Sequence, residues 1–180
     1  MVCSRCVEVV EKVLQQQGLA YQSVQLGEAV LKAPFGEEST AALKQSLEEE
    51  GFQLLDDTRA QLIEKVKNMI IGLVHQADKV SLPVKLSVLL EESTGADYSY
   101  LSSLFSETEG ITIEKYLIAQ RVERAKELLT YGELSLKQIA DKLGYSSTAH
   151  LSAQFKQVTG MTPSRFKSMA TELRKPLDQL

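Results

Sequence analysis

The sequence predicts a two-part protein: a small α+β unit, then an all-α domain in which two helix-turn-helix units are joined by a long helix. Three observations in the 180 residues support this. A stretch of alternating apolar residues at 21–33 lies between two helical patterns, and the patterns after residue 58 are all helical. The segment LSSLFSETEG at 101–110 returns as LSAQFKQVTG at 151–160, which indicates one helical unit used twice.

The first 57 residues are expected to form the α+β unit in the order α-β-β-α-β. Apolar residues at helical spacing, each run followed by a glycine, predict its helices. Alternating patterns and a glycine-containing turn predict its strands. The expected elements are a helix at 6–14, two strands within 21–33 around a turn at Gly27-Glu28, a helix at 39–50 and a strand at 52–55.

The remainder of the chain is expected to be helical throughout. A connecting segment at 58–79 opens with a capping-box pattern formed by Thr58 and Gln61. A domain at 80–175 follows, with helix-turn-helix units at about 82–106 and 135–158. Its predicted helices are 82–93, 98–105, 112–129, 135–143 and 147–158, followed by a helix that starts at Thr162-Pro163.

Charge is distributed unevenly along this chain of net charge −4. The first sixty residues are acidic, whereas residues from Gly132 onward hold seven Lys and Arg against four acids. A local basic face, rather than bulk charge, would therefore have to hold any polyanion. Only two histidines, His75 and His150, are present, and no glycine loop that cradles phosphate is found. We therefore expect no enzyme.

The sequence contains no run of eighteen apolar residues, so no membrane segment is expected. The N-terminus has no basic segment followed by an apolar one, which argues against secretion. We therefore expect a cytoplasmic protein, in which Cys3 and Cys6 act as a thiol pair or as metal ligands rather than as a structural disulfide.

The second copy of the repeat has the geometry of a DNA reader. A helix at 135–143, a turn containing Gly144 and a helix at 147–158 match a motif whose second helix lies in the major groove. Two packed helices with a glycine turn also occur as plain bundle architecture. Two copies joined by a rigid helix favour double-stranded DNA as the partner, with neighbouring major-groove faces about 34 Å apart. A monomer would suffice, so no oligomer is required.

Both copies and the helix between them share a wider pattern of residues. It consists of Leu101, Phe105, Gly110, Arg121, Ala125, Leu128, Leu129, Ile139, Ala140, Leu143, Gly144, Tyr145, Leu151, Phe155, Lys156, Gly160, Thr162, Pro163 and Lys167. With this pattern, residues 62–170 resemble the AraC/XylS family of bacterial transcription regulators. The resemblance implies seven helices in two helix-turn-helix subdomains, control of promoters, and RNA polymerase as a further partner.

Helix geometry selects the side chains that would face DNA. Leu101 and Phe105, with their equivalents in the second copy, must point inward, so the opposite faces are free to meet bases or phosphates. These faces carry mostly small residues, which predicts modest direct base reading and a contribution from DNA shape; a plain solvated face is the alternative. The candidate DNA-binding residues are Tyr98, Ser99, Ser102, Ser103, Thr148, Ala149, Ser152, Ala153, Lys156, Arg165 and Lys167.

The two readers are expected to be unequal. The turn at 94–96 is shorter than the second turn, and Asp97, a good N-cap, places a negative charge near the first reader. Lys156 and the basic surroundings strengthen the second reader. We therefore expect residues 147–156 to anchor binding and residues 98–106 to adjust it.

The front of the chain carries Cys-x-x-Cys at the start of a helix. Two soft sulfur ligands suit Cu(I), or an incomplete Zn(II) site. With the α-β-β-α-β order, residues 1–57 resemble a heavy-metal-associated domain, a ferredoxin-like sandwich, that lacks its first strand. We therefore expect the true start to lie upstream of Met1. Two functions remain open: a DNA-binding regulator that senses metal or thiol state through Cys3 and Cys6, or a metal-carrier or thiol-redox protein with a helical scaffold.

Overall fold

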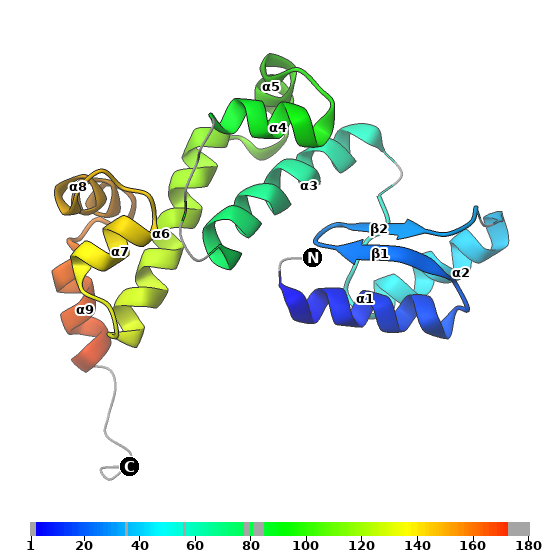
Figure 1. Ribbon diagram of the computed structural model, residues 1–180, viewed down its shortest axis with the longest axis horizontal. Helices are drawn as coiled ribbons and strands as arrows, with labels where there is room; N and C mark the ends of the chain where they lie inside the picture. The colour runs from blue at the N-terminus through cyan, green and yellow to red at the C-terminus, as the bar shows by residue number, and fades with distance from the viewer. Residues whose placement is uncertain (1–2, 35, 56, 78–79, 81–84, 173–180) are drawn as a thin grey trace, which may run out of the picture. The chain divides into compact units, whose positions relative to one another are not determined.

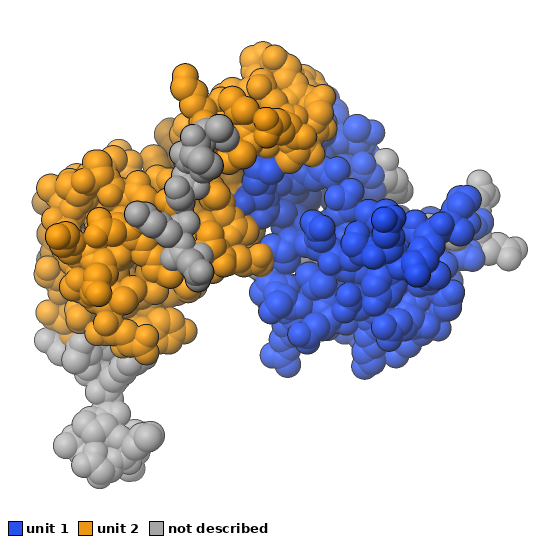
Figure 2. Space-filling model, in the orientation of Figure 1, with its two compact units in different colours: residues 1–69 blue, residues 70–180 orange. Residues whose placement is uncertain are grey.

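The computed structural model describes residues 3–34, 36–55, 57–77, 80 and 85–172. The chain divides into two compact units, residues 1–69 and 70–180 (Figure 2). The division falls inside helix α3, Thr58–Ile71. The described helices include none long and apolar enough to cross a membrane.

The front unit pairs two helices with a two-stranded antiparallel hairpin (Figure 1). Strand β1, Tyr21–Gln25, pairs with β2, Glu28–Leu31, and Gln25 lies opposite Glu28. The turn is therefore Leu26-Gly27, one residue earlier than predicted, because Gly27 supplies its positive φ of 80°. Helices α1, Ser4–Gln16, and α2, Glu37–Glu49, confirm the predicted helices and bury a core of Val10, Val13, Leu14, Leu43 and Leu47.

The predicted strand at 52–55 does not form, so the order is α-β-β-α rather than α-β-β-α-β. Phe52 and Leu54 pack against the front core, as the sequence pattern required. A strand also needs a neighbour for its backbone groups, and no strand lies beside this segment in the described structure. The Phe52 amide instead donates to the carbonyl of Leu47, at 2.8 Å, where α2 ends.

The start of α3 also differs from the prediction. The amide of Arg59 donates to the carboxylate of Asp57 at 3.0 Å, so Asp57 rather than Thr58 caps the helix. The side chain of Gln61 donates to the carbonyl of Leu55, at 2.7 Å, and takes no part in a capping box. A carboxylate accepts helix-start amides at least as well as a hydroxyl, which explains the shift by one residue.

The second unit is helical in every described element. It starts with the end of α3 and a short π-helix, η1, followed by six α-helices. The predicted helix start at Leu82 lies outside the described residues, as do residues 173–175 of the predicted domain. The elements are η1 Gly72–Gln76, α4 Leu86–Thr94, α5 Tyr98–Glu109, α6 Ile113–Tyr131, α7 Leu136–Lys142, α8 Thr148–Thr159 and α9 Pro163–Glu172.

Helix α6 organises this unit (Figure 1). It packs against α5, which precedes it in the chain, and against α7, α8 and α9, which follow it. The larger core cluster joins the inner face of α6 to the α7–α8 unit, and its centre is fully buried. Members of this cluster include Val122, Ala125, Leu129, Ile139, Leu143, Leu151 and Phe155.

The fifty-residue repeat extends further in the structure than the matched sequence segments. Phe105 of α5 packs edge-on against Tyr116 of α6, with ring centroids 5.5 Å apart. Phe155 of α8 packs in the same way against Phe166 of α9, at 5.6 Å. Tyr116 and Phe166 are themselves fifty residues apart in the sequence. The helices α5 and α8 are therefore each held to the next helix by an equivalent aromatic contact.

Val80 packs against the second helix-turn-helix unit. Its amide donates to the carbonyl of Lys142 at 2.7 Å, and its side chain is 2% exposed within the larger core. A Cβ at Gly144 would overlap the carbonyl oxygen of Val80. Gly144 therefore serves the turn through its φ of 71° and also makes room for this backbone.

Candidate nucleic-acid interface

The second helix-turn-helix unit is built by local signals that the sequence displays. Ser135 and Gln138 form a complete capping box at the start of α7, as predicted. After Gly144, Ser147 accepts from the amide of His150 at 3.1 Å and so caps α8. These caps fix where both helices begin, and hence which side of α8 faces outward.

Helix α8 turns its candidate DNA-binding residues away from the core. Leu151 and Phe155 are fully buried, whereas the residues on the opposite side are exposed or half-buried. We call this side the α8 face. It consists of exposed Ala149, Ala153 and Lys156, with half-buried Ser152 at its flank and Thr148 at the helix start.

A stacked set of side chains braces α8 against α6. The guanidinium of Arg121 lies over the ring of Tyr145, 5.7 Å from its centroid, and Tyr145 packs edge-on against His150 at 5.3 Å. Burial lowers the pKa of Arg121, which the neighbouring Tyr145 partly offsets, and burial raises the pKa of Tyr145. Arg121 therefore braces α6 against the turn before α8, and His150 is a packing residue.

The first helix-turn-helix unit has a shorter turn, as predicted. Residues 95–97 separate α4 from α5, whereas residues 143–147 separate α7 from α8. Asp97 caps α5 and accepts from the amides of Ser99 and Tyr100, at 2.8 and 3.4 Å. Hydrogen bonds from the Ser99 side chain, and then from these amides, lower the pKa of Asp97. The cap is therefore a fixed negative charge at the start of α5.

Tyr98, a candidate DNA-binding residue, is held by α6. Its hydroxyl donates a short hydrogen bond to the carboxylate of Glu114. Burial, together with this bond and the negative charge of Glu114, raises the pKa of Tyr98 to about 12. The same bond lowers the pKa of Glu114. This contact could not be predicted from the sequence, because sixteen residues and a helix boundary separate the two side chains.

Removal of this hydroxyl should weaken the helical unit in a pH-dependent way. We expect Tyr98→Phe to lower stability by roughly 0.5–1.5 kcal/mol at neutral pH, the range for a partly exposed hydrogen bond to a charged group. Because the pKa of Glu114 is lowered in the folded state, its contribution is present above the ordinary value of 4.5 and is lost as pH falls through the lowered pKa. Urea denaturation at a series of pH values measures this.

The difference between wild type and Tyr98→Phe should therefore shrink as pH falls below 4.5. The difference should also shrink as pH rises toward about 12. The pKa of Tyr98 is raised in the folded state, so the stabilisation by its hydroxyl is complete below the ordinary pKa of 10.0 and is lost as pH rises through the folded-state pKa of about 12. Tyr100→Phe, at an exposed tyrosine two residues away, is the control. A pH-independent difference would contradict the Glu114 bond.

The remaining candidates on the two units differ in charge. Ser99 and Ser103 are exposed on α5, Ser102 is half-buried, and none brings a positive charge. Lys156 on α8 and Arg165 and Lys167 on α9 are exposed. Residues 86–114 hold six carboxylates and no Lys, Arg or His, whereas residues 135–169 hold five Lys and Arg and one acid. The positive charge thus lies on the second helix-turn-helix unit and α9, not on the first helix-turn-helix unit.

The cysteine pair lies in the front unit, at the first turn of α1. The Sγ atoms of Cys3 and Cys6 are 3.5 Å apart, and no disulfide joins them. Two sulfurs on one tetrahedral Zn(II), at about 2.3 Å each, would be about 3.7 Å apart, so the pair fits half of such a site. Within the described residues, no group of three or more His, Cys, Asp or Glu could complete it.

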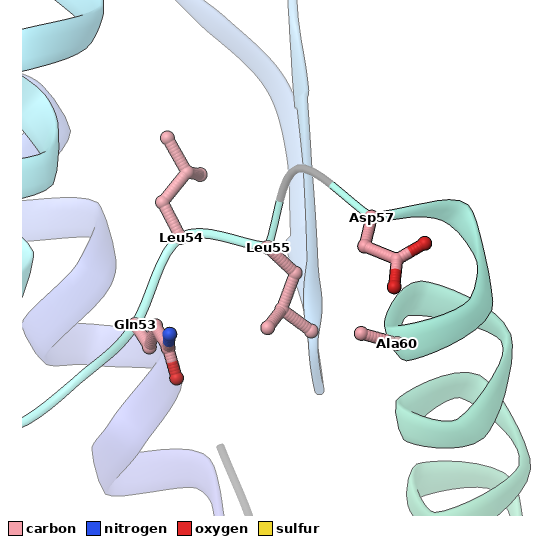
Figure 3. A pocket seen from close by; sticks show the side chains of 5 residues that line it. All are labelled: Gln53, Leu54, Leu55, Asp57 and Ala60. Carbon is pink, nitrogen blue, oxygen red and sulfur yellow. The ribbon is translucent and has the colours of Figure 1, made fainter.

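None of the candidate site residues is among those that line a pocket in the front unit (Figure 3). The pocket has a volume of about 390 Å³ and is open to solvent. Gln53, Leu54, Leu55, Asp57 and Ala60 line it, and Figure 3 shows them coming from the segment after α2 and from the start of α3. No pair of acid, base or nucleophile meets there.

Comparison with known proteins decides the nature of the second unit. Residues 90–169 match the family model described as a helix-turn-helix domain. Residues 90–169 form a helix-turn-helix domain. The sequence is 36% identical over 78 residues to an HTH-type transcriptional regulator of Staphylococcus aureus, and 30% identical over 105 residues to the probable transcriptional regulator LumQ of Photobacterium leiognathi.

The matches cover 43% and 58% of this chain, but only 10% of the staphylococcal protein and 42% of LumQ. The chain thus spans less than half the length of these relatives. The similarity describes the helix-turn-helix domain and its surroundings rather than the whole of either regulator.

Solved structures share the fold of this domain. The C-terminal domain of AraT, a response regulator from Geobacillus stearothermophilus, has a TM-score of 0.51 and 25% identity, over 60% of this chain and 84% of that domain. A regulator with an AraC-type DNA-binding domain from Chromobacterium violaceum has a TM-score of 0.51 and 22% identity, over 61% and 95%. The DNA-binding domain of AdpA, solved with a target DNA, has a TM-score of 0.51 and 20% identity, over 66% and 97%.

The helix-turn-helix domain therefore has the AraC-type fold, as the sequence predicted. Its relatives and structural neighbours are regulators and DNA-binding proteins, in agreement with the prediction that the chain is not an enzyme. The family match begins at residue 90 and so does not reach the front unit. The resemblance of residues 1–57 to a heavy-metal-associated domain stays a prediction.

Proposed function

We propose that this chain is a transcription regulator that binds double-stranded promoter DNA through its helix-turn-helix domain. The observation that carries the proposal is the α8 face: a capped helix, held rigidly by Arg121 and Tyr145, presents small side chains and Lys156 to solvent. Small side chains permit close approach to base edges and thymine methyl groups. Regulation then acts through RNA polymerase at the same promoter, by recruiting or excluding it.

Selection of bound duplexes from a random-sequence pool by the full chain tests this proposal. We expect a defined sequence to be enriched, and we expect the chain to protect that sequence within its own upstream promoter region. The neighbouring proteins of the same fold include one solved with its target DNA, which supports the choice of ligand. If no sequence is enriched at moderate salt, the proposal that the chain is a sequence-specific regulator is wrong.

Lys156 is expected to contact a phosphate. Lys156→Ala should weaken binding about tenfold on specific and scrambled duplexes alike, and should reduce the slope of log K against log salt by about 1. Fluorescence anisotropy titrations at several salt concentrations measure both. Lys12→Ala, at an exposed lysine of α1 in the front unit, is the control and should leave the slope unchanged. A sequence-dependent loss for Lys156→Ala would instead assign Lys156 to base reading.

The cysteine pair supplies the regulator with a sensor in this proposal. Cys3 and Cys6 would hold Cu(I), or Zn(II) with ligands from elsewhere, or would be oxidised by a disulfide reagent to a disulfide. Their 3.5 Å separation supports each reaction, since only a small side-chain rotation brings the sulfurs to bonding distance of about 2.05 Å. A metal-carrier or thiol-redox role uses the same two residues and differs in having no effect on DNA binding.

The double variant Cys3→Ser/Cys6→Ser separates these roles. We expect Cu(I), Zn(II) or oxidant to change the DNA affinity of the wild-type chain at least threefold, and to leave the variant unchanged. Equal responses of wild type and variant would eliminate the sensor while leaving the regulator intact. Binding of metal by the wild type without any change in DNA affinity would favour the carrier.

A further inference from the structure

We infer that only one of the two helix-turn-helix units contacts bases: α8 enters a major groove, and α5 makes no contact with the bases. This inference rests on the proposed function and concerns which of the two helix-turn-helix units reads sequence. It departs from the symmetric, two-groove grip that the repeat suggests at first. Three independent features of α5 carry it, and α8 lacks all of them.

The first feature is charge. From the start of α4 to the start of α6, residues 86–114 contain six carboxylates and no cationic side chain. Glu107 is exposed on the outer side of α5, at the position that corresponds to Gln157 on α8. Ser106 corresponds in the same way to Lys156. A helix that enters a major groove needs cations near the phosphates, but α5 and the turn before it carry none, and the one cation of the predicted unit at 82–106 is Lys85, before α4.

The second feature is the start of the helix. The amides of Tyr98, Ser99 and Tyr100 are the groups with which a helix start binds phosphate. All three donate to carboxylates: Tyr98 to Glu91 at 2.9 Å, and the other two to Asp97. The lowered pKa of Asp97 keeps that carboxylate ionised. A phosphate at the start of α5 would meet two negative charges instead of free amides.

Helix α8 begins differently. Its cap, Ser147, is a neutral hydroxyl and accepts only from the amide of His150. The amides of Thr148 and Ala149 have no acceptor among the described residues, so they are available to a ligand. No carboxylate belongs to α8 or its cap.

The third feature is Tyr98, the largest candidate at the start of α5. Its hydroxyl is bonded to Glu114 of α6, and the ring is half-buried in this position. The side chain therefore points toward α6, and its hydroxyl, bonded to the Glu114 carboxylate, is not available to a base or phosphate. Its equivalent, Thr148, is small and carries no such tether.

Hydroxyl-radical and methylation footprinting of the full chain on its selected duplex tests the single grip. We expect contacts with bases in one major groove, over about 4–6 base pairs. A two-footed grip would instead give two sets of contacts about 34 Å, or one helical turn, apart. Ser103→Glu and Ala153→Glu are matched substitutions at exposed positions fifty residues apart.

Ser103→Glu should change the affinity for the selected duplex less than about threefold, because α5 lies outside the groove, whereas Ala153→Glu should remove specific binding. Two protected grooves, or losses of similar size for both variants, would overturn the inference while the proposed function stands. Failure of the wild-type chain to select any duplex would overturn the proposed function itself. Circular dichroism melting of both variants checks that each remains folded.

Discussion

Gly144→Ala is expected to destabilise the helical unit by roughly 2–4 kcal/mol. Two causes act together. Alanine is strained at a φ of 71°, and its Cβ would overlap the carbonyl oxygen of Val80. If Val80 withdraws to relieve the overlap, its buried side chain and its bond to Lys142 are lost. Thermal unfolding followed by helical circular dichroism should show a midpoint lower by about 10 °C or more.

Gly95→Ala is the matched control for backbone strain. Gly95 has a φ of 70°, yet no atom lies within 4 Å of the position that a Cβ would take. It should therefore cost only about 1–2 kcal/mol, the strain term alone. Val80→Ala, which removes the side chain and keeps Gly144, should fall between wild type and Gly144→Ala. Equal losses at Gly144 and Gly95 would show that the docking of Val80 contributes nothing.

Ala153→Glu is expected to reduce affinity for the selected duplex by about 100-fold or more, since like-charge juxtaposition costs several kcal/mol. Ala153 lies at the centre of the α8 face, directly opposite buried Leu151 and Phe155. A carboxylate there would meet the base edges and phosphates of the groove. Because Ala153 is exposed and is not a member of the core cluster of this unit, the fold should persist. Anisotropy titration at fixed salt measures the loss.

Ala119→Glu provides the same chemical change on α6, at an exposed position outside both reader helices. It should alter affinity less than about threefold, the effect of a screened surface charge. Retained specific binding by Ala153→Glu would mean that α8 is not the reader. A comparable loss for both variants would indicate a general electrostatic effect instead of contact at the α8 face.

The helical half could be predicted closely because each of its boundaries carries a local signal. Ser135 with Gln138, Thr112 and the glycines after each helix mark starts and ends without reference to the rest of the chain. The fifty-residue echo added the arrangement of helices. With an offset of fifty, the sequence also held the equivalence of Tyr116 and Phe166, whose ring contacts are visible only in the structure.

The front unit was harder to predict because strands depend on partners far away in the chain. Residues 52–55 have the apolar pattern of a strand, and two of them do pack into the core, but the described residues include no neighbouring strand that could pair with their backbone. The turn at Leu26-Gly27 and the cap at Asp57 each missed the prediction by one residue, where two adjacent residues gave similar signals.

Contacts between distant side chains were also beyond reach of the sequence pattern. The bond from Tyr98 to Glu114, and that from the Tyr98 amide to Glu91, join different helices at a spacing with no periodic signature. These contacts matter because they place carboxylates at the start of α5, where a phosphate would otherwise bind. The shorter turn and the charge of Asp97 could be seen in the sequence, whereas the bonds of Tyr98 to Glu91 and Glu114 could not.

Competition binding at about 0.15 M salt tests the central claim most directly. The full chain is titrated onto a labelled duplex of the selected sequence, against unlabelled scrambled DNA of the same length and composition. We predict at least about 10³-fold preference for the selected duplex, the lower end for specific DNA-binding proteins. Ala153→Glu should erase this preference. Equal competition by both duplexes with the wild-type chain would contradict the account.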